Sequence, residues 1–268
     1  MARNYTPRHL LLIRKETNIK MNDRIRFLEE IASNGHVALK IIQYDGWLMR
    51  FANGFTGRAN SISILYPSTK PIEEKVSYCE ECYAKQGQPA LFKLTDGDKD
   101  FSDFLTSRGY QVVTPTDIMV IDDLSSVGGK SLFEDCIFSS TPDEWLPYFF
   151  EYENITDEKK QETFRQMLST VLVQTIYCSV IHEGKVIACA GAAIEHGYAL
   201  IQYVIVSEAA RGKGIGEKLC RALIAKAKES GAHHAYLQVL QSNEIAKNLY
   251  KKLGFKKEYS YWYMKQSV

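Results

Sequence analysis

The sequence lacks both an excess of one charge and a long apolar run. Its 268 residues include 33 Lys and Arg and 32 Asp and Glu, which gives a formal net charge of +1. That balance provides no basic field of the kind that attracts nucleic acid. The apolar run at residues 10–13 is closed by Arg14 and Lys15, and it is too short for a signal-peptide core or a membrane span. We therefore expect a cytoplasmic protein whose partner is small, with no nucleic-acid or membrane partner.

Cysteine is also scarce, with six residues scattered along the chain. In a reducing compartment such residues default to small buried side chains and not to a disulfide framework. Only Cys79 and Cys82 form a Cys-x-x-Cys pair, and no second pair completes the four ligands of a structural zinc site. Because Cys79 lies on a helical stripe with Val76 and Tyr83, packing explains it better, and we expect no metal.

A glycine-rich stretch, Arg211-Gly-Lys-Gly-Ile-Gly216, lies between an apolar run and a helical pattern. Its glycines can adopt backbone angles closed to other residues and leave room for a ligand against the main chain. Unpaired amides and the helix dipole attract an anion there, and Arg211 and Lys213 add full charges. The stretch is neither a P-loop nor a Rossmann fingerprint. It predicts a phosphate-binding loop, with a plain tight turn as the alternative that the flanking sequence must decide.

The flanks resemble two motifs of the GNAT superfamily of N-acetyltransferases. Residues 204–216 read Val-Ile-Val-Ser-Glu-Ala-Ala-Arg-Gly-Lys-Gly-Ile-Gly, similar to the family's strand followed by Arg/Gln-x-x-Gly-x-Gly/Ala. Residues 243–255 read Asn-Glu-Ile-Ala-Lys-Asn-Leu-Tyr-Lys-Lys-Leu-Gly-Phe, similar to Asn-x-x-Ala-x-x-x-Tyr-x-x-x-Gly-Phe. The resemblance covers roughly residues 140–268 and implies acetyl-CoA as co-substrate.

The first half of the chain looks like a degenerate copy of the second. Gly109 follows a short helical pattern and leads to a strand, as Gly254 does 145 residues later. The loop position of this half reads Pro67-Ser-Thr-Lys70, without glycine. Because proline has no amide hydrogen, this half cannot hold a pyrophosphate in the same way. The arrangement resembles tandem GNAT proteins with one active copy.

We therefore predict an α/β (α+β) fold of two tandem GNAT-like domains, each a mixed, mostly antiparallel central sheet flanked by helices. Residues 1–126 form the degenerate domain, 127–139 a linker, and 140–268 the acetyl-CoA-binding catalytic domain. The expected helices begin near residues 21, 71, 101, 142, 157, 215 and 243. The expected strands are residues 39–44, 47–52, 60–66, 90–94, 117–121, 175–181, 186–194, 198–206, 235–240 and 259–264.

The resemblance also implies roles for individual residues. The strand end would pair with the pantetheine arm, and one of its amides would receive the thioester oxygen. Asn243 would bind the pantetheine side, and Tyr250 would be the general acid that protonates the leaving thiolate, with a core tyrosine as the alternative. The strand end comprises Val204, Ile205 and Val206, and the pyrophosphate loop comprises Arg211, Gly212, Lys213, Gly214, Ile215, Gly216 and Glu217.

The general base is not identified. Many family members have Glu two residues before the position of Val204, whereas this chain has Gln202, and an amide cannot accept a proton. Gln202 can still orient a water. Tyr203, Glu195 and His196 are nearby candidates, with core packing or turn formation as competing explanations.

The implied function is direct transfer of an acetyl group from acetyl-CoA to a small-molecule or peptide amine of unidentified kind. The alternative is a non-catalytic acyl-CoA-binding or regulatory module, favoured by Gln202 and by the degenerate first half. A transferase that uses aminoacyl-tRNA is disfavoured by the CoA loop and the absence of a basic face. The oligomeric state is not predicted.

Overall fold

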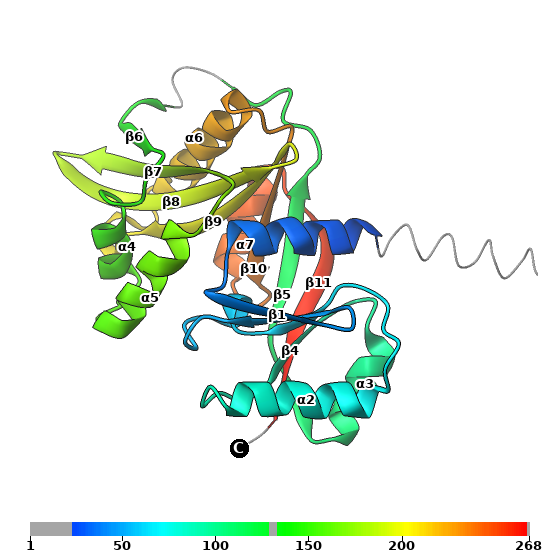
Figure 1. Ribbon diagram of the computed structural model, residues 1–268. Helices are drawn as coiled ribbons and strands as arrows, with labels where there is room; N and C mark the ends of the chain where they lie inside the picture. Colours follow the sequence, from blue (N-terminus) through cyan, green and yellow to red (C-terminus); the bar gives the residue numbers. More distant parts are fainter. Residues whose placement is uncertain (1–22, 129–132, 267–268) are drawn as a thin grey trace, which may run out of the picture.

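The structure of the protein, a computed structural model, describes residues 23–128 and 133–266 (Figure 1). Its 11 strands form one sheet in the order β1-β2-β3-β4-β11-β5-β10-β9-β8-β7-β6. Only the β3–β4 and β9–β10 pairs are parallel, so the predicted mixed, mostly antiparallel α/β architecture is confirmed. Within the described residues, no helix is long and apolar enough to cross a membrane.

The first half begins with a helix at residues 23–35, drawn in blue in Figure 1. An Asp45-Gly46 turn follows the first strand, and both residues have positive φ, as a tight hairpin requires. The predicted start of the helix at residue 21 lies outside the described residues. The other elements are β1 (Lys40–Tyr44), β2 (Trp47–Phe51), η1 (Gly57–Ala59), β3 (Ile62–Ile64), α2 (Ile72–Ala84), β4 (Leu91–Thr95), α3 (Lys99–Ser107) and β5 (Tyr110–Ile121).

The second half contains a strand that the sequence pattern did not predict. This strand, β6, lies within residues 127–139, the stretch predicted to be a linker. The division of the chain at those boundaries stays a prediction. The elements are β6 (Cys136–Ser139), α4 (Leu146–Tyr152), α5 (Glu158–Ser169), β7 (Gln174–His182), β8 (Lys185–Glu195), β9 (Tyr198–Val206), η3 (Glu208–Ala210), α6 (Ile215–Glu229), β10 (His234–Leu240), α7 (Glu244–Lys252) and β11 (Lys256–Gln266).

The two halves exchange their last strands within the sheet. β11 lies between β4 and β5, and β5 lies between β11 and β10 (Figure 1). Thr116 on β5 pairs with Tyr261 on β11, and these residues are related by the offset of 145 that also separates Gly109 from Gly254. The same offset converts the pair Thr95–Tyr261 into Leu240–Thr116. The pairing of these strands therefore has pseudo-two-fold symmetry, which confirms the predicted internal repeat.

Alternating side chains of the strands point to two differently covered faces. On β10, Val239 packs in a core cluster with residues of α6 and α7. Tyr236, three residues earlier on the same strand, points to the opposite face and packs against the 23–35 helix. Met264 packs with residues of α2 and α3. Consequently α2, α3, α6 and α7 cover one face, and the 23–35 helix, α4 and α5 cover the other.

A buried ion pair attaches the 23–35 helix to the centre of the sheet. Glu29 bonds Lys93 Nζ on β4 and accepts a 2.7 Å hydrogen bond from Tyr259 Oη on β11. Glu29 and Lys93 are 4% and 8% exposed, so neither charge is solvated by bulk water. The ammonium also lies 4.0 Å from the centroid of the Tyr261 ring. The carboxylate thus joins one helix to strands of both halves.

We expect Glu29→Gln to destabilise the protein by about 3 kcal/mol, because it leaves the Lys93 ammonium buried without a counter-charge. Urea unfolding measures the change. Asp103→Asn is the control, since it removes a carboxylate from the exposed Lys99–Asp103 pair and should cost less than about 1 kcal/mol. Equal losses in the two variants would contradict the role given to the buried pair.

Candidate functional site

A cavity of about 780 Å³ opens where β9 and β10 separate. The two strands pair in parallel from Tyr198–His234 to Ile201–Leu237 and no further. Gln202 and Val204 of β9 and the residues after Leu237 on β10 then line the cavity. The remaining walls come from the first half, including β5, and from α4, α5, α7 and β11 of the second half. The site therefore belongs to both halves of the chain.

A β-bulge lies next to this point of separation. On β8, Cys189 pairs with Ile205 and Gly191 pairs with Gln202, so β9 carries one extra residue between these pairs. Tyr203 lies in the bulge with φ of 59°, a strained value for a non-glycine residue. A Cβ on Gly191 would come within 3.1 Å of the Tyr203 ring, so glycine provides the space that the bulged tyrosine needs.

The predicted pyrophosphate loop has an open backbone. Gly212 and Gly214 have φ of 73° and 77°, and no atom lies within 4 Å of a Cβ built on either residue. Gly214 is the N-cap of α6, and no side chain caps that helix end. The free amides at the helix start and the space in front of them fit a pyrophosphate group. Arg211 and Lys213 are exposed beside the loop.

The neighbouring predicted residues continue from that loop. Ile215 and Gly216 form the first turn of α6, and Val204, Ile205 and Val206 form the half-buried end of β9. Glu217 differs from the rest, because its carboxylate pairs with Arg221 at 3.0 Å and with Lys252 at 2.5 Å. Those cations, Lys252 first, lower its pKa, and the side chain ties α6 to α7. Only the main chain of Glu217 is therefore available to a phosphate.

Asn243 and Tyr250 both line the cavity from α7. Asn243 caps the helix, because its Oδ1 accepts a 3.0 Å hydrogen bond from the amide of Ala246, which leaves its Nδ2 as a donor. Tyr250 is 8% exposed and packs edge-on against Phe255. Burial raises the pKa of Tyr250, so its hydroxyl stays protonated at neutral pH. The protonated hydroxyl suits a proton donor.

The candidates for the general base separate clearly in the structure. Gln202 and Tyr203 line the cavity, whereas Glu195 and His196 lie at the opposite end of β9, beside the β8–β9 turn. Gln202 donates from Nε2 to the carbonyl oxygen of Gly35 at 2.9 Å. Its Oε1 is buried and makes no hydrogen bond among the described residues.

His36, which the sequence analysis did not single out, is the further residue of this group. It follows the 23–35 helix, is buried, and lines the cavity. Its Nδ1 lies 3.0 Å from Tyr203 Oη and its Nε2 lies 3.1 Å from Thr56 Oγ1. Burial, then the charges of Arg58 and Arg50, lower the pKa of His36 well below its ordinary value. The imidazole is thus neutral at physiological pH and can accept the Tyr203 hydrogen.

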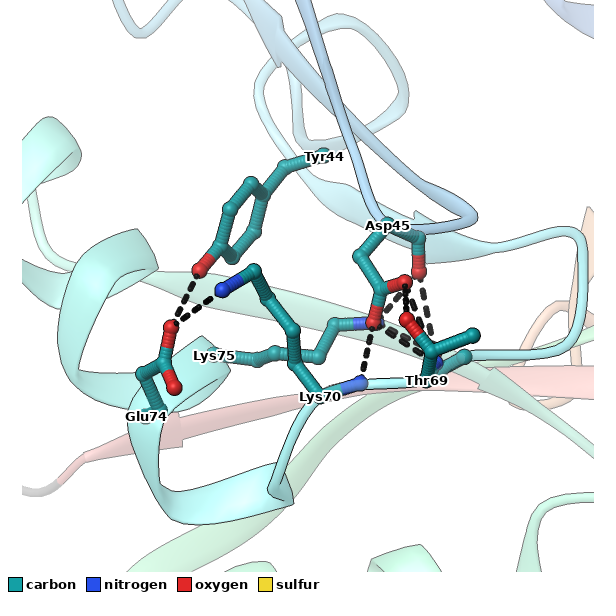
Figure 2. Close-up of polar contacts among 7 residues, drawn as sticks. Tyr44, Asp45, Thr69, Lys70, Glu74 and Lys75 are labelled. Atoms are coloured by element: carbon teal, nitrogen blue, oxygen red, sulfur yellow. Dashed lines mark hydrogen bonds and ion pairs between the residues drawn. The ribbon is translucent and has the colours of Figure 1, made fainter.

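The first half fills the corresponding loop with its own carboxylate. At the start of α2, the helix that matches α6, the amides of Thr69 and Lys70 donate to the Asp45 carboxylate at 3.0 and 2.9 Å (Figure 2). Thr69 Oγ1 donates to it at 2.8 Å, and Lys75 Nζ lies 3.3 Å away. These donors, led by the Lys70 amide, lower the pKa of Asp45. An internal anion therefore occupies the position of a phosphate.

Comparison with known proteins agrees with this architecture. A family model described as "Probable histone acetyltransferase Rv0428c C-terminal" matches residues 23–264. The Uncharacterized N-acetyltransferase YobR of Bacillus subtilis is 25% identical over 237 residues, which cover 87% of this chain and 95% of the relative. The GCN5-related N-acetyltransferase 6, chloroplastic, of Arabidopsis thaliana is 28% identical over 116 residues, 43% of this chain and 33% of the relative.

Two solved structures share the fold across most of the chain. A GCN5-related N-acetyltransferase from Kribbella flavida has a TM-score of 0.60 at 13% identity, covering 90% of this chain and 95% of its own. A tandem GNAT protein from the clavulanic acid biosynthesis pathway has a TM-score of 0.61 at 14% identity, covering 76% and 74%. At these identities the likeness concerns the fold alone.

We expect Asp45→Asn to lower the melting temperature at pH 7, because it removes the charge that the Thr69 and Lys70 amides and Lys75 bind. The folded-state pKa is lowered, so the carboxylate stabilises the protein above its unfolded pKa of about 4 and ceases to do so as the pH falls through the folded value. The difference from wild type should therefore narrow below pH of about 4. A difference independent of pH, measured by thermal unfolding, would contradict the charge-based account.

Proposed function

The chain belongs to the Rv0428c C-terminal acetyltransferase family and to the GNAT superfamily, and from this we propose that it transfers an acetyl group from acetyl-CoA directly to an amine. The observation that carries the proposal is the separation of β9 from β10. It creates one cavity that is reached by the strand end beside the open glycine loop and by Tyr250. A plain tight turn at residues 211–216 would need neither the bulge nor the cavity.

Each part of the site has a role in the proposed reaction. When bound, acetyl-CoA supplies an acetyl thioester. The amides of residues 212–217 hold the pyrophosphate, and the free edge of β9 at Val204 pairs with the pantetheine arm. A β9 amide directed at the thioester oxygen stabilises the charge that develops there. Tyr250 would donate its hydrogen to the departing sulfur as the nitrogen–carbon bond forms, and the hydrogen that the nitrogen loses would pass through solvent in the open cavity to restore the Tyr250 hydroxyl.

The other side of the cavity binds the acceptor amine in its neutral form. In the imidazole tautomer whose Nδ1 accepts the Tyr203 hydrogen, the lone pairs of the tyrosine oxygen remain free to accept a hydrogen from the amine. Burial, and then the charges of Arg58 and Arg50, disfavour an imidazolium at His36, so the imidazole orients Tyr203 and does not store the proton. A site of this kind needs no carboxylate at position 202.

We expect Tyr250→Phe to slow turnover on the order of 10- to 1,000-fold while acetyl-CoA affinity holds, because the ring still fills its place in the core. Thiol release over a panel of amines measures the first quantity, and calorimetry measures the second. Equal turnover by the variant would make Tyr250 a packing residue. Tight acetyl-CoA binding with no thiol release from any amine would favour the regulatory-module alternative.

We expect the pH dependence of kcat/KM to follow the acceptor. The bound amine must be neutral, and His36 is already neutral above its lowered pKa, so activity should rise with pH until the amine's own pKa is passed. An amine with a pKa of about 8 and one of about 10.4 should therefore give rising limbs displaced by about 2 pH units. If kcat/KM rises at the same pH for both amines, the titrating group is a base on the enzyme and not the acceptor amine.

A further inference from the structure

Arg58 carries a guanidinium without a protein partner in the wall of the cavity. It lies in the short η1 helix, is half-buried, and lines the site. Every other arginine in residues 23–128 and 133–266 donates a side-chain hydrogen bond. Arg58 has neither a side-chain hydrogen bond nor an ion pair within those ranges. Burial raises the pKa of Glu153 in the same wall and the charge of Arg58 opposes that rise, yet no hydrogen bond or ion pair joins these two side chains. The guanidinium therefore keeps donors free for an anion in the cavity.

The backbone that presents Arg58 is held firmly. Its carbonyl oxygen accepts a 2.5 Å hydrogen bond from Arg50 Nη1, and Thr56 caps the η1 helix through the Ala59 amide. A Cβ on Gly57 would come within 3.2 Å of the Tyr263 ring, so this segment packs closely against β11. The guanidinium therefore extends into the cavity from a fixed point of the first half.

Arg58 lies close to the groups that would hold the amine. After burial, the positive charge of Arg58 has the largest effect on the pKa of both His36 and Tyr203. The same wall carries Lys160 and Lys265 but only one carboxylate, that of Glu153. This excess of cations disfavours a second ammonium and favours an anion. Beside it, Phe55 stacks on Phe164 at 5.1 Å, which offers an apolar surface.

From this juxtaposition we infer that the acceptor is a primary amine that also bears a carboxylate, an amino-acid-like compound, with Arg58 binding the carboxylate and Tyr203 facing the amine. This inference rests on the proposed function and narrows its substrate class. The planar guanidinium matches a carboxylate with two parallel hydrogen bonds. Basic peptides and polyamines, which would bring further positive charge to Arg58, are poor substrates on this account.

Matched pairs of amines test the inference. Leucine and phenylalanine would be compared with leucinamide and phenylalaninamide, which carry a neutral amide in place of the carboxylate, at a pH above the amine pKa of all four compounds. Spermidine and a lysine-rich peptide complete the panel. We expect kcat/KM for each carboxylate to exceed that of its amide by about 10- to 100-fold, the range for a hydrogen-bonded charge. Arg58→Gln should abolish that preference, and Arg58→Lys should restore part of it. Arg165→Gln, which removes a cation from the outer face of α5, is the control that should leave it unchanged.

Calorimetry of the same amines with CoA present separates this inference from the proposed function. Amino-acid binding that is lost in Arg58→Gln supports the inference even without turnover, in which case the proposed reaction fails alone. Acetylation of the amides or the basic peptide at rates equal to the carboxylates would overturn the inference and leave the acetyltransferase proposal standing. An unchanged preference of the Arg58→Gln variant for carboxylates over amides would also overturn the inference.

Discussion

The pairing of β5 with β11 is the constraint on which the other features of this molecule depend. Each strand belongs to one half by sequence, yet each completes the sheet beside the other half. This exchange turns two small sheets into one and places first-half residues against the end of β9. His36 and Arg58 reach the cavity only because the halves are joined in this register. The degenerate first half is therefore a wall of the site, whatever it has lost as a cofactor-binding unit.

The two loop positions differ in what lies in front of the helix start. In the second half, glycines keep the backbone open in front of α6. In the first half, the amides before α2 are satisfied by Asp45, which comes from the hairpin turn between β1 and β2. Amides at a helix start need an acceptor, and a carboxylate fixed in the fold is as suitable as a phosphate. In the first half these amides thus bind a side chain of the same half and stabilise the fold.

The sequence predicted the features that depend on local patterns. Glycine spacing, hydrophobic periodicity and the Asp45-Gly46 turn placed most helices and strands, and the offset of 145 residues predicted the repeat. The same rules fail for contacts between distant residues. His36 and Tyr203 are separated by 167 positions, and no local pattern marks a histidine that ends a helix as a residue of the site. The predicted strand at residues 117–121 is also shorter than β5, which begins at Tyr110 and includes Pro115. Thr114, with φ of 48°, bends the chain there.

The strand exchange also has a consequence for biosynthesis. A ribosome delivers β11 after every other strand described here, yet β11 lies in the middle of the finished sheet, between β4 and β5. Until residues 256–266 emerge, β4 keeps one unpaired edge and β5 can pair on one side only. Unpaired strand edges of this kind promote aggregation of incompletely folded chains. Nascent chains of this protein thus stay open to such association until translation of the last strand, and completion of the first half waits for the end of the second.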